Sequence, residues 1–240
     1  MNEISYLKSY RTQDYEKLSL TTDILIFTLD REHRLQILLS RRTQFPYKGF
    51  WALPGGFVQI DASLEEEASR VLREKTGLSD LHLEQLYTFG DKDRDPRMRI
   101  VTVAYLALMP RDSVCRLEKE AEFFRIEEGE SELIFHGSCR IEEGSLAFDH
   151  SRIIRLALQR MKGKLHYTDI ALRLLKDPNR FTIFELQKIY ETIENKSYDT
   201  PNFRRYFKTR YESTGIAEKT EESGTEFSKR PSSYYRLAKP

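Results

Sequence analysis

The chain has 240 residues, enough for two domains of ordinary size, and its 39% hydrophobic and 32% charged residues fit folded domains rather than a disordered chain. Its two cysteines, Cys115 and Cys139, lack the spacing of a zinc site or a disulfide framework. Residues 1–20 lack the apolar stretch of a signal peptide, and no apolar run reaches about 20 residues, the length of a membrane helix, so we expect a cytoplasmic protein without a membrane partner.

The net charge of +1 conceals two halves of opposite charge. Residues 1–150 contain 20 Lys and Arg against 27 Asp and Glu, a net charge of −7, whereas residues 151–240 contain 19 against 11, a net charge of +8. A basic half joined to an acidic half is typical of a nucleic-acid module attached to another domain. The alternative is a chance imbalance between solvated surfaces.

The first predicted elements form a β-hairpin. Residues 22–30 and 35–40 are apolar, β-branched runs separated by a charged turn. The sequence FWALPGGFV, residues 50–58, then predicts a strand and a sharp turn at two glycines, where the backbone can approach a ligand closely.

A helix is predicted directly after this turn. Ser63 and Glu66 have the spacing of a capping box, and Gly77 provides the stop. The apolar residues that recur at helical spacing are Leu64, Ala68, Val71 and Leu72.

The next predicted element is a central strand over residues 100–108, which are nearly all apolar, as in a strand buried on both faces. Residues 113–147 predict strands and loops. A helical pattern over residues 149–161 then leads into a mostly helical region. We therefore place a domain boundary between residues 150 and 151.

Two helices of different character are predicted in the second domain. The first, residues 182–194, has Thr182 as its cap and buries one apolar face. The second begins at Thr200, with Pro201 in its first position, and carries aromatic residues on one face and a basic face that extends to Arg210. Residues 215–237 predict a β-hairpin.

A packing helix, a basic helix and a hairpin together predict a winged helix-turn-helix, in which the second helix enters the major groove of duplex DNA and the hairpin contacts phosphate or the minor groove. The alternative for the basic helix is a solvated face. The residues predicted to contact DNA are Thr200, Asn202, Arg204, Arg205, Lys208, Lys219, Lys229 and Arg230.

The first domain contains a motif that resembles a known enzyme signature. Residues 55–78, GGFVQIDASLEEEASRVLREKTGL, resemble the signature of Nudix hydrolases without a gap. The resemblance implies a Nudix fold over about residues 20–150. The matching positions are Gly56, Arg70, Leu72, Glu74, Gly77 and Leu78.

The chain departs from this signature at the positions that bind the metal ion in Nudix hydrolases. Its four glutamates correspond to Ala62, Val71, Glu74 and Lys75, so one carboxylate remains. In an active Nudix hydrolase the last three of these glutamates lie on one helix face and together hold Mg²⁺. A single carboxylate beside a lysine ammonium group cannot hold this ion. We predict no catalytic residue, no metal and no pyrophosphate hydrolysis. The residues 65–67, all glutamate, leave two alternatives: a displaced metal site or a solvated first turn.

A pocket that has lost its catalytic groups can serve as a sensor. Residues 87–105 resemble the loop and strand of Nudix domains of the ADP-ribose type, and arginines there offer fork-shaped donors to phosphate, unless they compensate the charge of the neighbouring aspartates. Trp51 and Phe57 could stack on adenine or fill the core. The residues predicted to bind the effector are Arg42, Lys48, Trp51, Gly55, Gly56, Phe57, Glu74, Arg94 and Arg97.

Across nearly its whole length the chain resembles the Nudix-related transcriptional regulators of NAD metabolism, the NrtR family. The motifs that carry the resemblance are the degenerate Nudix signature, RDPR, FTIFELQKIYE, NFRRYF and KRPSSYYRL. The departures are Tyr206, where lysine is common, and KRPSS, where GGRPA is typical.

This resemblance implies an α+β protein, with a Nudix-fold α/β/α sandwich that senses the effector over residues 1–150 and a winged helix-turn-helix over residues 151–240. It further implies a homodimer that represses genes of NAD biosynthesis or salvage on double-stranded operator DNA. ADP-ribose or a related NAD metabolite would be its effector, with no cofactor required. The alternatives are an active Mg²⁺-dependent ADP-ribose pyrophosphatase with an accessory domain and an RNA-binding protein.

Overall fold

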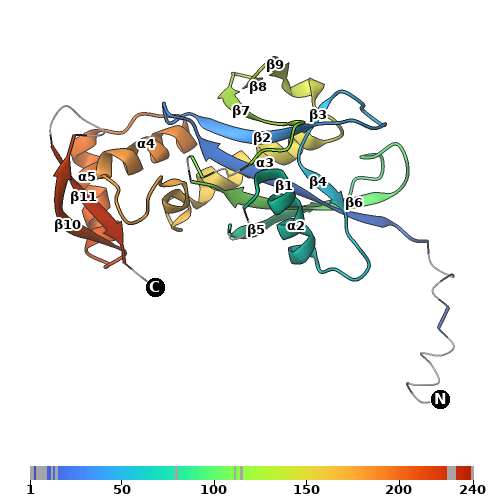
Figure 1. The fold of residues 1–240 in the computed structure, drawn as a ribbon, viewed down its shortest axis with the longest axis horizontal. Helices are drawn as coiled ribbons and strands as arrows, with labels where there is room; N and C mark the ends of the chain where they lie inside the picture. Colours follow the sequence, from blue (N-terminus) through green and yellow to red (C-terminus); the bar gives the residue numbers. More distant parts are fainter. Residues whose placement is uncertain are drawn as a thin grey trace.

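The computed structural model describes residues 3, 10–11, 13, 16–78, 81–110, 112–113, 116–225 and 231–238. A large mixed β-sheet occupies one end of the molecule, and a helical unit with a two-stranded sheet occupies the other (Figure 1). Helix α3 (His150–Lys164) lies between them in the chain.

The predicted hairpin is confirmed. Strands β1 (Ser19–Leu29) and β2 (Leu35–Arg41) pair antiparallel, with Phe27 opposite Ile37. The Asp30 carboxylate accepts hydrogen bonds from the backbone N–H groups of Glu32 and Arg34, which closes the turn.

The predicted central strand is also confirmed. Strand β6 (Ile100–Leu108) is almost entirely buried between β1, which it pairs in parallel, and β5 (Leu83–Phe89), which it pairs antiparallel. The sheet has the order β5-β6-β1-β2-β7-β8-β9, with β3 beside β2 and β4 beside β1. The remaining elements of this part are β3 (Trp51–Ala52), β4 (Gly55–Phe57), β7 (Ala121–Glu128), β8 (Leu133–His136), β9 (Arg140–Glu142) and the 3₁₀ turn η2 (Glu143–Ser145).

Helix α2 (Leu64–Thr76) has the boundaries that its caps predict. The Ser63 side chain accepts from the Glu66 backbone N–H, the Glu66 carboxylate accepts from the Ser63 N–H, and Gly77 ends the helix with a φ of 74°. The apolar side of α2 covers one face of the sheet, where Ile24 and Ile26 of β1 are buried.

Helix α3 covers the opposite face of the same sheet. Alternate residues of β1, such as Leu25 and Phe27, join a second apolar cluster with Ile153 and Met161 of α3, because successive side chains of a strand point to opposite faces. The α/β/α sandwich that the sequence predicts is therefore confirmed. The second cluster continues into the C-terminal unit without interruption, so α3 packs in both parts of the molecule.

The C-terminal unit has the predicted order of a packing helix, a second helix and a hairpin. Thr182 caps α4 (Ile183–Glu194) by accepting from the Glu185 N–H, and Asp199 caps α5 (Thr200–Phe207) by accepting from the Asn202 N–H. Strands β10 and β11 pair antiparallel. The other bounds are η3 (Ile170–Leu174), the π-helical turn η4 (Lys208–Glu212), β10 (Ala217–Gly224) and β11 (Ser232–Leu237).

Candidate functional sites

Two arginines and three aromatic rings meet on the Nudix-like part of the molecule. The Arg42 guanidinium carbon lies 4.7 Å from the centroid of the Phe148 ring, and that of Arg97 lies 5.9 Å from it. Arg97 also lies 5.5 Å from the Phe57 ring, and Tyr47 contacts Phe148 edge to face at 4.8 Å. We call these five residues the arginine–aromatic site.

The charge of this site is only partly compensated. Asp95 accepts from Arg97 at 3.0 and 2.8 Å, and although burial opposes its ionisation, the Arg97 hydrogen bonds lower the Asp95 pKa overall. Arg42 donates from Nε to the Pro46 carbonyl at 2.8 Å, and among the described residues no carboxylate forms an ion pair with it. Burial, followed by the nearby charge of Arg97, lowers the pKa of Arg42. The site therefore has an excess of positive charge beside aromatic faces, which suits an anion attached to a planar group.

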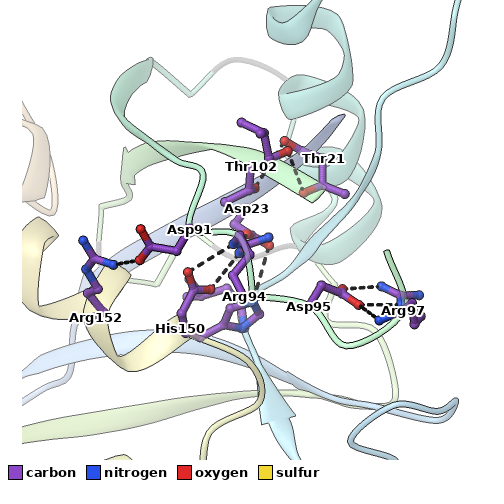
Figure 2. Close-up of polar contacts among 12 residues, drawn as sticks. Thr21, Asp23, Asp91, Arg94, Asp95, Arg97, Thr102, His150 and Arg152 are labelled. Carbon is purple, nitrogen blue, oxygen red and sulfur yellow. Dashed lines mark hydrogen bonds and ion pairs between the residues drawn. The ribbon is translucent and has the colours of Figure 1, made fainter. Parts of the chain in front are cut away.

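Arg94 is buried between two carboxylates. Its side chain is 4% exposed, and its guanidinium donates to both carboxylate oxygens of Asp149, at 3.1 and 2.7 Å. It also donates to Asp23 at 3.5 Å, and Figure 2 shows Arg94 beside Asp23 and His150. Both carboxylates come from outside its own loop, so the hydrogen bonds of the Arg94 guanidinium go to Asp149 and Asp23 and not to the loop aspartates. Arg152 of α3 pairs with Asp91 of the same loop nearby.

His150 completes this buried group. Its Nδ1 accepts from the Leu53 backbone N–H at 2.8 Å, and its Nε2 faces Asp23 Oδ1 at 3.6 Å. Burial lowers the pKa of His150 despite the attraction of Asp23, so the ring is neutral and carries its proton on Nε2.

The helix face that would hold Mg²⁺ in a Nudix enzyme does not fit the ion. Val71 is 2% exposed in the apolar cluster beneath α2, and Lys75 pairs with Glu118. The Glu74 carboxylate accepts from Arg70 at 2.7 Å. A single carboxylate already paired with a guanidinium cannot provide the oxygen shell that Mg²⁺ requires.

The three glutamates in the first turn of α2 are engaged separately. Glu65 accepts from the Tyr105 hydroxyl at 3.2 Å, Glu66 caps the helix, and Glu67 is buried against Arg70. Within the described ranges, no group of three or more His, Cys, Asp or Glu is placed to hold a metal. Glu65 and Glu66 are exposed, as in a solvated first turn, whereas Glu67 is buried and paired with Arg70.

The other predicted effector residues are dispersed. A Cβ on Gly55 would clash with the Thr22 carbonyl, so the absence of a side chain lets this glycine pair closely with β1. Gly56 faces Glu67 and Arg70 of α2, on the same side as Glu74. Trp51 packs edge to face on Phe124 at 4.7 Å against the core, and Lys48 lies 5.9 Å from the Phe45 ring. The structure thus brings together Arg42, Phe57 and Arg97.

Tyr47 and Phe148 were missed in the sequence. Phe148 follows β9 and the turn η2 and has a φ of 55°, an uncommon conformation for a bulky residue. Neither helical nor strand periodicity applies to such a position, so no local signal relates it to Arg42.

The second candidate site is the exposed face of α5. Arg204 and Lys208 line a groove of about 330 Å³ between this helix, the start of α4 and strand β11. Asn202 and Arg205 are exposed beside them. The other residues that line the groove are Ile183, Phe184, Gln187, Thr200, Pro231, Ser232, Ser233 and Tyr235.

Arg210, predicted to continue the basic face, is turned inward. It donates to the Thr168 carbonyl at 2.8 Å and lies 5.3 Å from the Tyr211 ring. Residues 208–212 form a π-helical turn, whose wider geometry changes the direction of the side chains after Phe207.

The hairpin has little positive charge where it is described. Lys219 is exposed on β10, but Glu218, Glu221 and Glu222 share that strand, and Arg236 of β11 pairs with Glu218. The predicted contacts Lys229 and Arg230 lie outside the described residues.

Buried tyrosines anchor α5. The Tyr190 hydroxyl of α4 lies 2.5 Å from the Tyr211 hydroxyl and 3.2 Å from that of Tyr206, and it donates to the Leu165 carbonyl at 3.1 Å. Burial raises the pKa of Tyr190, so the cluster stays uncharged. Tyr206, which stands where lysine is common, is thus half-buried against the apolar core of the unit.

The fold and these sites define a class: a Nudix domain joined to a winged-helix DNA-binding domain. The model of the NUDIX domain matches residues 19–136, and that of the NrtR DNA-binding winged helix domain matches residues 173–237. The chain is 36% identical to the ADPR responsive transcriptional repressor NtrR of Acinetobacter baylyi, over 99% of this chain and 89% of that protein. The chain belongs to the NrtR family of Nudix-related transcriptional regulators, as its sequence motifs predict.

Solved structures agree with this assignment. NrtR of Shewanella oneidensis, complexed with a 27mer DNA, is 31% identical and superimposes with a TM-score of 0.72, covering 91% of this chain and 93% of that one. The NUDIX domain of the same protein, complexed with ADP ribose, is 33% identical with a TM-score of 0.52, covering 67% of this chain and 99% of that one.

Proposed function

We propose that the protein is a transcriptional repressor of NAD biosynthesis or salvage genes, which binds operator DNA through its winged helix and releases it when its Nudix domain binds ADP-ribose or a close NAD metabolite. The observation that carries the proposal is the arginine–aromatic site, in a chain whose relatives include an ADPR responsive repressor and a NUDIX domain complexed with ADP ribose. Pyrophosphate is the anionic part of ADP-ribose, and adenine is its planar part.

The site suggests how the effector binds. Arg42 and Arg97 can donate fork-shaped hydrogen bonds to the pyrophosphate, and the rings of Phe57 and Phe148 offer faces for adenine. Lys48 and Gly56 are further candidates at the edges, whereas Arg94 is assigned to positioning.

The proposal includes no enzymatic activity and requires no cofactor. The alternative, a Mg²⁺-dependent ADP-ribose pyrophosphatase, needs carboxylates where this chain has Val71 and Lys75. Within the described residues, no helix is both long and apolar enough to cross a membrane. We place the protein in the cytoplasm, where it would meet both DNA and NAD metabolites.

Operator binding is assigned to the exposed face of α5 and to the hairpin. Arg204 and Lys208 border the groove between them, and Thr200, Asn202, Arg205 and Lys219 are candidates for further contacts. We propose a homodimer, because paired recognition helices read two half-sites about one helical turn apart.

The test is binding to duplex operator DNA in the presence of increasing ADP-ribose, with NAD and a simple sugar as comparisons. We expect ADP-ribose to lower operator affinity in a saturable manner, and the sugar to have no effect. Unchanged operator affinity at saturating ADP-ribose would contradict the proposal.

A further inference from the structure

Phe148 and Asp149 connect the arginine–aromatic site directly to the start of α3. The Phe148 ring is in contact with Arg42, Arg97 and Tyr47. Asp149, the next residue, is the N-cap of α3. A ligand that displaces the Phe148 ring therefore acts one residue away from the first turn of this helix.

The Asp149 side chain does not cap its helix. It makes no cap hydrogen bond, although aspartate is a preferred capping residue, and instead receives two hydrogen bonds from the Arg94 guanidinium. The side chains of Arg94 and Asp149 are 4% and 16% exposed, so solvent screens this pair little. A bidentate pair also fixes the relative orientation of its two groups. The start of α3 is thus joined to loop 91–99, which also carries Arg97 of the site.

The other end of α3 is joined to the DNA-binding unit. The Leu165 carbonyl, directly after the helix, accepts from the Tyr190 hydroxyl of α4, and Tyr190 in turn contacts Tyr206 of α5. Met161 and Leu165 are buried in the apolar cluster that includes Leu186 and Ile189 of α4. Because a helix of this length moves as a rigid element, a displacement at its start reaches the surface that holds α4 and α5.

We infer that Asp149 is a positioning residue that couples effector binding to DNA release, because its pair with Arg94 makes loop 91–99 and the start of α3 move as one body. The inference rests on the proposed function. When an anionic ligand draws Arg97 and displaces Phe148, the Arg94–Asp149 pair transmits the change in the loop to α3. Arg94 and Asp149 lie outside both the arginine–aromatic site and α5, so loss of their pair should reduce the coupling while both separate affinities are kept.

A second ion pair between the same two elements provides a matched control. Arg152 of α3 pairs with Asp91 of the loop, but their side chains are 60% and 64% exposed. Exposed pairs are screened by solvent and hold their partners loosely. The buried pair, and not the exposed one, is therefore the mechanical connection.

The experiment measures the ADP-ribose dissociation constant by calorimetry, for free protein and for the protein–operator complex, in the wild type and in the Asp149→Asn, Arg94→Lys and Arg152→Gln variants. For the wild type we expect about tenfold weaker binding to the complex. Asp149→Asn should bring the ratio of the two constants close to one, with the ADP-ribose constant of the free protein and the operator constant without ADP-ribose each within about threefold of wild type. Arg152→Gln should keep the wild-type ratio.

Arg94→Lys keeps a positive charge between Asp23 and Asp149 but loses the fork, so it tests the same connection if Asp149→Asn fails to fold. If Asp149→Asn keeps the wild-type ratio of the two ADP-ribose dissociation constants, the coupling inference is wrong and the proposed function stands. If Asp149→Asn does not fold, the same conclusion follows from a wild-type ratio in Arg94→Lys. If the ratio falls only in variants that also lose affinity for both ADP-ribose and the operator, the pair has a merely structural role and the coupling inference is likewise wrong. A ratio of one in the wild type itself contradicts the proposed function.

Discussion

The guanidinium of Arg42 lies 4.7 Å from the centroid of the Phe148 ring, although the two residues are far apart in the sequence. Loop 42–50 and the segment before α3 meet here, and Arg97 approaches from a third segment. The contact leaves Arg42 half-buried beside a second cation, an arrangement that an anion would relieve.

Arg42→Ala is expected to weaken ADP-ribose binding by roughly 1.5–3 kcal/mol, the usual contribution of hydrogen bonds to charged groups. Operator binding without ADP-ribose should be unchanged, because Arg42 is remote from α5. Calorimetric titration of ADP-ribose measures the effect. The control is Arg41→Ala, since Arg41 is exposed and donates to the Gly49 carbonyl. Equal losses in the two variants would show that Arg42 has no specific role.

The sequence singled out three of the five residues of this site for a physical reason that can be stated. Arg42, Phe57 and Arg97 stand near a turn or on a loop, where chemistry-bearing residues are commonly exposed. Arg94 stands on the same loop as Arg97, but its side chain is buried, because its partners Asp23 and Asp149 come from distant segments. Local spacing carries no information about such partners, whereas the caps of α2 depend on neighbours alone and were predicted correctly.

The protein is expected not to release AMP from ADP-ribose in the presence of Mg²⁺. Val71 is buried among apolar residues and Lys75 pairs with Glu118, so only Glu74 remains of the metal-binding face. Chromatography of the products measures hydrolysis, and binding of ADP-ribose by the same preparation is the control for a folded pocket. Turnover at about 1 s⁻¹ or faster would identify an enzyme.

Arg204→Ala is expected to weaken operator binding by roughly 1–3 kcal/mol, the range for an arginine that reads a guanine edge, and to leave ADP-ribose binding unchanged. Fluorescence anisotropy with labelled duplex measures the affinity. Lys196→Ala is a charge-matched control, because Lys196 follows the far end of α4 and borders a cavity beside Arg125 of β7. An equal loss in the control would indicate a general effect of charge.

For the second domain, the sequence predicted the helices and strands more accurately than the side chains that lie on the surface. Amphipathic spacing and turn residues gave α4, α5 and the hairpin, because these signals are local. Arg210 was assigned to the DNA face by extending α-helical spacing past Phe207, but the chain enters a π-helical turn there and Arg210 binds the Thr168 carbonyl. Helical periodicity cannot predict where the helix changes its own geometry.

The stability of the protein is expected to fall as the pH decreases below about 6.5, in part through His150. Burial lowers the pKa of this residue in the folded state, whereas in the unfolded chain it has its ordinary value of about 6.5. As the pH falls through that value the unfolded state takes up a proton that the folded state resists, so unfolding becomes more favourable. His150→Asn removes the titration and can still accept from the Leu53 N–H.

Melting temperatures between pH 7.5 and 5.5 check this expectation. The decrease should be smaller in His150→Asn than in the wild type, even if the variant is less stable at pH 7.5. His82→Asn is the control, because burial and Arg173 also lower the pKa of His82 but its side chain is exposed and its effect should be smaller. Parallel curves for the wild type and His150→Asn would contradict the prediction.

Lys208→Ala is expected to weaken binding to the operator and to an unrelated duplex by the same factor, and to reduce the slope of log affinity against log salt by about 0.9. Lys208 borders the groove beside α5, and a lysine that contacts phosphate releases one counterion without reading a base. Lys219→Ala should reduce the slope equally if β10 follows the DNA backbone as proposed, although Glu221 and Glu222 share its strand. Anisotropy titrations at four salt concentrations give the slopes for both duplexes. An unchanged slope for Lys208→Ala with a loss confined to the operator would show that Lys208 reads a base, and an unchanged slope for Lys219→Ala would remove β10 from the DNA interface.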